Sequence, residues 1–445
     1  MTPMPTTWAD LAGRRVGVWG LGTEGLANLA RLADVGADAV IVDDHPERAS
    51  AALGGTTPVL APDSAGLAAL RECGVVVKSP GVSRHRPEVQ SLIAGGVRVV
   101  GGLSLWLAGT HGERVACITG TKGKSTTTEI AAHLARGLGV RAKAGGNLGL
   151  PPWAPEAPGD VELWVVETSS YQAADLEVSP PVVAVTSLAP DHLPWHGDTA
   201  TYYADKLSLC TRTGAHLTVA AADCAELVAH RHLLGPAVRW VDADTYDPSW
   251  TKPLRLRGRH NLVNAAVART VLSELGVAEA DDDTAFAAAA EGFAGLDGRL
   301  ETVAVVDGVE FVDDGLSTNV LPTLAALDTF AGRRIALIAG GAERDLDYSA
   351  LGDALANRPA PTLVTTVYRT GPAIAGAVRD AAARSARSTT EVVACADLDD
   401  AVRRGWRWAR PDGVVLLSPA AASFDAFTDH RHRSRAFREA IAALR

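Results

Sequence analysis

Residues 117–127 read CITGTKGKSTT, and this stretch decides how the middle of the chain folds. Residues 114–118 before it have the composition of a buried strand, and residues 125–138 after it carry apolar positions at helical spacing. A glycine-rich loop between a strand and a helix is typical of a phosphate-binding loop, although Ile118 stands where the G-x-x-x-x-G-K-[ST] pattern has its first glycine. We therefore predict a shortened nucleotide loop; a turn that only caps the helix is the alternative.

The residues of this loop suit the phosphates of ATP. Gly120 and Gly123 leave room for backbone N–H groups to face an anion at the start of the helix. Lys124 would neutralise the β- and γ-phosphates, and the Ser125 hydroxyl would ligate Mg²⁺. The other loop residues that we expect to contact the nucleotide are Thr121, Lys122 and Thr126.

Two further strands of the same predicted sheet are followed by polar residues. Glu167 closes the apolar run 161–167, and His192 follows the run 182–186. The carboxyl ends of parallel strands meet at one edge of a sheet, so both side chains could share one ion with Ser125. A solvated strand-end carboxylate and a structural histidine are the alternative interpretations of these two residues.

A second glycine turn lies near the N-terminus. Residues 20–25 read GLGTEG; they follow a predicted strand, 15–19, and precede a helix and a strand that ends in Asp43 and Asp44. This is the G-x-G-x-x-G arrangement of a dinucleotide-binding βαβ unit. The motif alone is weak evidence, so it leaves an NAD-dependent oxidoreductase open as an alternative function.

Strand and helix signals alternate along most of the chain. At 445 residues the chain is too long for a single hydrophobic core. We predict an α/β protein of three domains: a Rossmann-like domain at residues 1–108, a central phosphate-loop ATPase domain with a mostly parallel sheet at 109–300, and a second Rossmann-like domain at 301–445.

Composition excludes several function classes. The net charge of −10 leaves no basic surface for nucleic acid. The apolar stretches are too short to predict a membrane span, and the N-terminus does not read as a signal peptide. Five scattered cysteines without a C-x-x-C pair predict reduced thiols, so we expect a cytoplasmic protein.

Taken together, the motifs resemble those of the Mur ligases, which are ATP-dependent amide ligases of peptidoglycan synthesis with three domains in this order. The resemblance covers nearly the whole chain and rests on GTKGKST, ETSSYQ, DHL-x-WHG, YADK, GRHNLVNA, GRLE, VDDGLSTN and LLSPAAASFDAF. The GLGTEG turn in a compact first domain, SPG at residues 79–81 and the late SPA-x-ASFD segment are most similar to the branch that joins glutamate to UDP-N-acetylmuramoyl-L-alanine. The resemblance implies a UDP-sugar in the first domain, ATP with one or two Mg²⁺ ions in the second, and an acyl-phosphate intermediate. We expect a monomer.

The resemblance also implies roles for individual residues. Lys124, Glu167, His192 and Lys206 would be catalytic; Ser125, Glu167, His192 and Lys206 would hold metal, with Lys206 carbamylated. Further nucleotide contacts would come from Asn261, Asn264, Arg299 and Asp314, with helix capping as the alternative for the two asparagines. The UDP-substrate and glutamate would contact Gly22, Thr23, Asp43, Ser79, Gly81, Asn147, Ser169, Gln172, Thr318, Arg344, Ser418 and Ser423.

Several positions depart from the commoner, D-glutamate-adding enzymes of this branch. In the third domain, Leu316 stands in place of a lysine, Arg344 aligns with a second lysine, and His430 aligns with an aromatic residue. Lysines there would neutralise the glutamate carboxylates, so these changes alter both geometry and charge. We therefore predict L-glutamate as the acceptor, with a separate epimerase inverting the product; the D-glutamate enzyme is the runner-up. Departures elsewhere are Lys122 and Ser187, each in place of asparagine, and Gly298 in place of histidine.

Two further alternative functions explain fewer of the motifs. Folylpolyglutamate synthases share the ATP-binding and C-terminal domains but lack the N-terminal unit that contains GLGTEG. A non-catalytic protein on the ligase fold would leave Lys124, Glu167, His192 and Lys206 without a common role.

Overall fold

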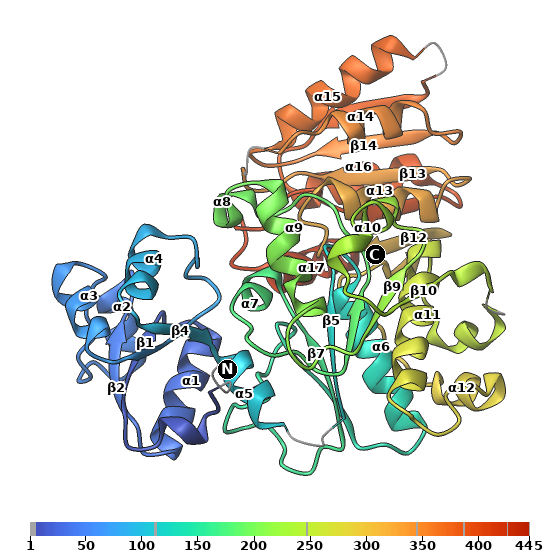
Figure 1. Ribbon diagram of the computed structural model, residues 1–445. Coiled ribbons are helices and arrows are strands. Elements are labelled where there is room, and N and C mark those ends of the chain that lie inside the picture. Colours follow the sequence, from blue (N-terminus) through green and yellow to red (C-terminus); the bar gives the residue numbers. More distant parts are fainter. Residues whose placement is uncertain are drawn as a thin grey trace. The chain divides into compact units, whose positions relative to one another are not determined.

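The computed structural model describes residues 6–110, 114–245, 248–343, 346–385, 388–424 and 426–444. It divides into two compact units, Met1–Pro253 with Val263–Phe293 and Leu254–Leu262 with Ala294–Arg445. Over the described ranges, the first unit contains a four-stranded and a six-stranded sheet, and the second unit contains another six-stranded sheet (Figure 1). The predicted α/β fold with parallel sheets is confirmed.

The first sheet has the strand order β2-β1-β3-β4, and all of its pairings are parallel. Helices connect the strands, as parallel pairing requires. The strands are β1 (Arg15–Trp19), β2 (Asp38–Val42), β3 (Val75–Lys78) and β4 (Arg98–Gly101), with η1 (Ala9–Leu11), α1 (Thr23–Asp34), α2 (Pro46–Ala52), α3 (Ser64–Arg71), α4 (Pro87–Ala94) and α5 (Gly102–Gly109) around them.

The second sheet has the order β10-β9-β8-β5-β7-β6 and is also parallel in every pairing. Its strands are β5 (Arg114–Thr119), β6 (Ala142–Gly146), β7 (Leu163–Glu167), β8 (Val182–Val185), β9 (Leu217–Ala221) and β10 (Val238–Val241). The helices of this region are α6 (Lys124–Gly137), α7 (Ser170–Ala174), α8 (Leu193–His196), α9 (Thr199–Leu207), η2 (Ser208–Cys210), α10 (Ala225–Ala229), η3 (Arg231–Leu233), η4 (Ala243–Thr245), η5 (Pro248–Leu254), α11 (Arg259–Glu274) and α12 (Asp283–Ala289).

The third sheet has the order β11-β12-β16-β13-β14-β15, in which only the β11–β12 pairing is antiparallel among the described strands. Its strands are β11 (Glu301–Val306), β12 (Val309–Asp313), β13 (Ile335–Ala339), β14 (Thr362–Thr366), β15 (Thr390–Ala394) and β16 (Val414–Leu417). The helices are α13 (Val320–Thr329), α14 (Ser349–Ala356), α15 (Gly371–Arg384), α16 (Leu398–Ala409) and α17 (His430–Ala442).

Burial explains why these segments are strands. Every residue of β3, β7, β8 and β13 is buried, as expected for parallel strands covered by helices on both faces. Their sequences, VVVK, LWVVE, VVAV and IALIA, are accordingly continuous apolar runs rather than alternating ones. The polar residue that ends such a run, such as Glu167, therefore marks the carboxyl edge of the sheet.

The two sheets of the first unit share one hydrophobic core. Val18 and Val77 of the first sheet belong to the same cluster of buried residues as Cys117 and Val166 of the second. Polar contacts join the sheets as well: the buried Lys78 ammonium pairs with Asp175, and Trp153 Nε1 donates to Asn28 Oδ1 at 2.8 Å. The first glycine turn and the phosphate loop are thus held on one scaffold.

Two further expectations concern the whole chain. All five cysteines are free thiols, in line with the prediction of reduced cysteines. Within the described ranges, no helix has both the length and the apolar composition needed to cross a membrane.

Candidate active site

The phosphate loop lies between β5 and α6, at the carboxyl edge of the second sheet. Gly120 and Gly123 have φ of 141° and 89°, a region that favours glycine. A Cβ at Gly120 would lie 2.2 Å from Thr186 Oγ1, and one at Gly123 would lie 2.4 Å from Asn264 Oδ1. Both positions therefore require glycine for conformation and for space.

Neighbouring strands hold the loop in place. Thr121 N–H donates to the Ser187 carbonyl at 2.9 Å, and Lys122 N–H donates to Ser187 Oγ at 2.8 Å. The Thr121 hydroxyl lies 2.9 Å from the Tyr202 hydroxyl on α9. The residues after β8 thus fix the start of α6, where an anion would face the helix dipole.

Glu167, at the end of β7, presents a buried carboxylate beside the loop. Its Oε1 accepts a 2.7 Å hydrogen bond from Asn147 Nδ2, which orients the group. Its Oε2 is buried, and no described residue supplies a hydrogen-bond partner for it. A buried carboxylate oxygen without a protein donor is costly unless a cation or water meets it.

Lys206 on α9 also contacts the phosphate loop. The side chain is buried, and its Nζ donates to the Gly120 carbonyl at 3.0 Å. Burial, reinforced by the charge of Lys124, lowers the pKa of Lys206 well below its ordinary value. A lowered pKa increases the neutral fraction of the amine, and the neutral amine is the nucleophilic form.

His192 precedes α8 with a left-handed backbone, at φ 54°. Its Nδ1 lies 2.9 Å from the Tyr171 hydroxyl, so Nε2 is the ring nitrogen that could bind a metal ion. Burial lowers the pKa of His192 to about 4; the charge of Asp191 opposes this change, and the charges of three nearby lysines act in the same direction as burial. The imidazole is therefore neutral at physiological pH and keeps a lone pair for a ligand.

Lys122, the departure noted in the loop, pairs with Asp191. Its Nζ lies 3.2 Å from Asp191 Oδ2 in a partly exposed pair. Burial opposes ionisation of Asp191, yet the charges of Lys122 and His192 hold its pKa below the usual value. The lysine thus links the loop to the segment that carries His192.

These donors fit a divalent cation. Ser125 offers a hydroxyl at the start of α6, Glu167 an oxygen without a described donor, and His192 a neutral ring nitrogen. The strands β8, β5 and β7 are adjacent and parallel, so the segments that follow them lie at one edge of the sheet.

A cavity of about 560 Å³ opens at the first glycine turn. It extends from Gly20–Glu24 to Gly146–Gly149, the turn that carries Asn147. Asp43 closes the turn by accepting from Leu21 N–H at 2.7 Å, and Ser79 Oγ donates to the Gly20 carbonyl at 2.6 Å. The substrate residues predicted from sequence that line the cavity are Gly22, Thr23, Asp43, Ser79, Gly81 and Asn147.

Comparisons with known proteins show matches over most of the chain. Residues 118–238 match the model of the Mur ligase middle domain, and residues 298–421 match that of the Mur ligase, glutamate ligase domain. A Micromonospora protein named UDP-N-acetylmuramoyl-L-alanine--L-glutamate ligase is 40% identical over 97% of both chains. A Salinispora tropica protein of the same name is 38% identical over 97% of this chain and 98% of its own.

The chain belongs to the Mur ligase family. The resemblance and the ligase class predicted from the sequence are thereby confirmed. Among solved structures, a UDP-N-acetylmuramate-alanine ligase from Thermotoga maritima matches with a TM-score of 0.57 and 19% identity, covering 97% of this chain and all of its own. That likeness concerns the fold alone.

The second unit of this Mur ligase contributes a separate polar cluster at the ends of β12 and β16. Asp314 is buried, accepts from the Ser317 hydroxyl, and lies 2.7 Å from Ser418 Oγ. Burial raises the pKa of Asp314 to about 7, although the hydroxyl donors and the charge of Arg299 oppose the rise. Ser418 Oγ also lies 2.9 Å from Thr323 Oγ1. Asp314 and Ser418, predicted for different ligands, are thus direct partners.

The remaining predicted residues are distributed over both units. Asn264, in the first unit, abuts Gly123, while Asn261, grouped with the second, donates from Nδ2 to the Arg257 carbonyl at 2.8 Å. Asn261 lies inside α11 and its amide donates in this contact, whereas an N-cap side chain accepts from a backbone N–H, so this contact is not a helix cap. Thr318 is half-buried after β12, and Ser423 is buried after β16. Arg344 lies outside the described residues.

Ser169 and Gln172 form a capping box at the start of α7. Ser169 Oγ accepts from Gln172 N–H, and Gln172 Oε1 accepts from Ser169 N–H. The Gln172 amide also donates to Glu24 Oε1 at 2.6 Å, which connects α7 to the first glycine turn. The capping box therefore positions Gln172 against Glu24, which lines the cavity.

Sequence reasoning missed several residues of this site. Glu24, inside GLGTEG, lines the cavity, and burial raises its pKa to about 7. Thr186 and Tyr202 hold the phosphate loop through side-chain hydroxyls. An acid within a diphosphate-type turn was the available signal for Glu24; no local pattern marks the other two.

Proposed function

We propose that this Mur ligase joins L-glutamate to UDP-N-acetylmuramoyl-L-alanine in an ATP-dependent reaction. The observation that carries the proposal is the pairing of Asn147 with Glu167, through the side-chain amide and through the backbone N–H. Asn147 lines the cavity of the first turn, and Glu167 stands beside the phosphate loop. A substrate held in the cavity could therefore present its carboxylate to a nucleotide in the loop. The names of the close relatives support the same reaction.

The first glycine turn suits the UDP part of the donor. The start of α1, at Gly22 and Thr23, would face the diphosphate, and Asp43 would lie near the uracil. We accordingly assign residues 1–108 to UDP-sugar binding, 109–300 to ATP and 301–445 to the amino acid.

In the first step, an oxygen of the L-alanyl carboxylate attacks the γ-phosphorus of ATP, and the bond to the β-phosphate oxygen breaks. Lys124 neutralises charge on the transferring group, and Gly120–Gly123 fix its position. Ser125, Glu167 and His192 would hold Mg²⁺, which supplies further neutralisation when bound. Further nucleotide contacts are proposed for Thr121, Lys122, Thr126, Asn261, Asn264, Arg299 and Asp314.

In the second step, the free amine of glutamate attacks the acyl carbon, and phosphate leaves with the oxygen that came from the carboxylate. The attacking amine must be neutral, so it gives up a proton before or during the attack. We assign glutamate to the ends of β12 and β16, with contacts from Thr318, Arg344, Ser418 and Ser423.

Lys206 is proposed to act as a carbamate. Its lowered pKa favours the neutral amine, which can add to CO₂ with loss of one proton. The product is an anion beside Lys124 and the metal ligands, so its charge would be compensated. Ser125, Glu167, His192 and this carbamate would then hold one or two Mg²⁺ ions.

The choice of L-glutamate rests on the close relatives' names and on Leu316, which is half-buried where D-glutamate enzymes carry a lysine. An L-configured product would call for an epimerase acting later. The D-glutamate ligase remains the second candidate.

The test is phosphate release by the purified protein with ATP, Mg²⁺, UDP-N-acetylmuramoyl-L-alanine and each glutamate enantiomer. We expect turnover with L-glutamate and at least tenfold less with D-glutamate. Preference for the D form would reverse the stereochemical assignment. Absence of phosphate release with both forms would contradict the proposed reaction.

A further inference from the structure

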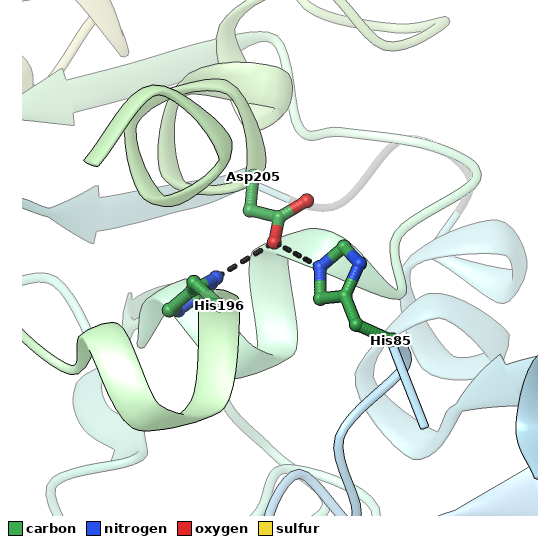
Figure 2. Close-up of side chains that lie close together, drawn as sticks. All are labelled: His85, His196 and Asp205. Atoms are coloured by element: carbon green, nitrogen blue, oxygen red, sulfur yellow. Dashed lines mark hydrogen bonds and ion pairs between the residues drawn. The ribbon is translucent and has the colours of Figure 1, made fainter. Parts of the chain in front are cut away.

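A second group of ligand-type side chains lies apart from the proposed catalytic residues. Figure 2 shows His85, from the loop between β3 and α4, facing Asp205 on α9, with His196 at the end of α8 on the other side. His85 Nε2 and His196 Nδ1 each lie 2.7 Å from Asp205 Oδ2. One atom from each residue fits within 4.8 Å of the others. The loop after β3 therefore meets the consecutive helices α8 and α9 at one point, 120 residues apart in sequence at His85 and Asp205.

We propose that His85, His196 and Asp205 bind a single transition-metal ion of the zinc type. Two imidazoles and one carboxylate are a common donor set for zinc, whereas Mg²⁺ prefers oxygen ligands. Around a tetrahedral zinc ion with bonds of about 2.0–2.1 Å, donor atoms lie roughly 3.4 Å apart. Two of the separations observed here are 2.7 Å, and one ligand atom from each residue lies within 4.8 Å of the others, so small side-chain movements would complete the site.

His196 has the support that metal-binding histidines usually have. Its side chain is fully buried, and its Nε2 lies 2.9 Å from Ser170 Oγ, which is also buried. The ring packs between Trp195 and Tyr202, at centroid distances of 4.4 and 5.1 Å. An outer hydrogen bond and tight packing fix the ring so that Nδ1 points at Asp205.

His85 and Asp205 leave the site open on one side. The side chain of His85 is 36% exposed and that of Asp205 is 16% exposed. An ion could therefore enter from solvent, and water could fill a fourth position. An open position of this kind distinguishes the site from a closed structural one.

The hydrogen-bonded arrangement is what such ligands adopt without metal, because one carboxylate oxygen can accept from two imidazole N–H groups. A permanent hydrogen-bonded link between the loop after β3 and helices α8 and α9 is the competing explanation. The two explanations predict different effects when the negative charge of Asp205 is removed. An amide at residue 205 still accepts hydrogen bonds but is a poor zinc ligand.

The test is equilibrium dialysis of the full chain against Zn²⁺ with excess Mg²⁺, which occupies oxygen-rich sites. We expect one tightly bound zinc per chain, weakened at least tenfold by His85→Ala, by His85→Gln and by Asp205→Asn. His232→Ala is the matched control, because it removes another histidine that lies beside His230, at a ring distance of 6.0 Å. It should leave tight zinc binding unchanged.

Co²⁺ provides a second readout, because its visible absorption intensifies in four-coordinate sites. The same variants should abolish the absorption, and His192→Gln should preserve it. Circular dichroism checks folding; His85→Gln keeps a polar side chain at an exposed position if His85→Ala fails to fold. Absence of zinc uptake by the parent, or equal affinity in parent and Asp205→Asn, would overturn the proposal in favour of a hydrogen-bonded link.

Discussion

The two glycine turns of the first unit occupy the same place in a strand–turn–helix unit and carry opposite side-chain charge. Each turn joins a parallel strand to the start of a helix, although Gly22 before α1 has φ −71° and Gly123 before α6 has φ 89°. The turn at Gly123 is surrounded by Lys122, Lys124 and Lys206, whereas the turn at Gly20 carries Glu24 and Asp43.

The difference separates binding from chemistry. Both turns present backbone N–H groups that can face phosphate. The turn at Gly123 also has ammonium groups that can compensate charge on a phosphoryl group in transfer, and Glu167 nearby that would hold a divalent cation. A glycine turn between a strand and a helix would therefore hold a diphosphate at Gly20 and activate a triphosphate at Gly123. The predictions below test that division, from the largest effect to the smallest.

Lys124→Met should nearly abolish turnover. Removing the ammonium leaves the transferring phosphoryl group without its main cation, and we expect phosphate release to fall about 10³-fold. Lys143→Ala, at an exposed position on β6, is the control and should stay close to the parent. Activity within tenfold of the parent in Lys124→Met would mean that the two turns do not differ in function.

Glu167→Gln should cost about 10²-fold in kcat and raise the Mg²⁺ concentration needed for half-maximal rate. The amide retains the shape of the side chain but replaces the carboxylate that we assign to the ion. Mg²⁺ titrations of the phosphate-release rate measure the effect, with the exposed Glu162→Gln as control. An unchanged Mg²⁺ requirement would remove Glu167 from the ion site.

Alanine at Gly123 or at Gly20 should weaken the binding of one substrate and leave the binding of the other unchanged. Gly123→Ala would place a Cβ 2.4 Å from Asn264 Oδ1, and Gly20→Ala would place one 3.0 Å from Ser79 Cβ. We expect the KM for ATP to rise roughly tenfold in the first and the KM for the UDP-substrate to rise in the second, because each loop must shift. Gly139→Ala, with φ 82° and nothing within 4 Å, imposes the same strain without crowding.

Urea denaturation of these variants separates strain from binding. All three should lower the free energy of unfolding by about 1–2 kcal/mol. Equal rises of both KM values in Gly20→Ala would contradict separate roles for the two turns.

Glu24→Gln should have the smallest effect on catalysis and a clear effect on pH dependence. Burial raises the pKa of Glu24 from 4.5 to about 7. Between these values the folded protein binds a proton that the unfolded chain releases, so the parent loses stability as pH rises from about 5 to 7. The variant should lack this loss, which amounts to at most about 3 kcal/mol. Urea titrations from pH 5 to 8 measure it, with exposed Glu47→Gln as control; parallel curves for parent and Glu24→Gln would refute it.

Most central strands of the fold could be predicted, with β9 as an exception, and most of the edge strands could not. Continuous apolar runs mark β3, β7, β8 and β13, which are buried on both faces. The strands left out of the prediction include β6, β10, β11 and β15, and each lies at the edge of its sheet. Edge strands are partly exposed, and β6 reads AKAGG, so composition carries little signal there.

The candidate site shows the same limit. Lys124, Glu167 and His192 follow directly from strand ends and a loop pattern. The partners of these residues come from distant segments: Asn147 orients Glu167, Tyr171 contacts His192, and Asp191 pairs with Lys122. Such contacts depend on how helices pack on the sheet, and local sequence patterns do not reveal that packing.

The most direct test of the account follows oxygen from the donor carboxylate. UDP-N-acetylmuramoyl-L-alanine labelled with heavy oxygen in its carboxylate is incubated with ATP, Mg²⁺ and L-glutamate, and the released phosphate is analysed by mass spectrometry. An acyl-phosphate route predicts that each phosphate carries one labelled oxygen from the donor. Unlabelled phosphate, released at the rate of product formation, would show that the donor carboxylate does not attack ATP and would contradict the central claim.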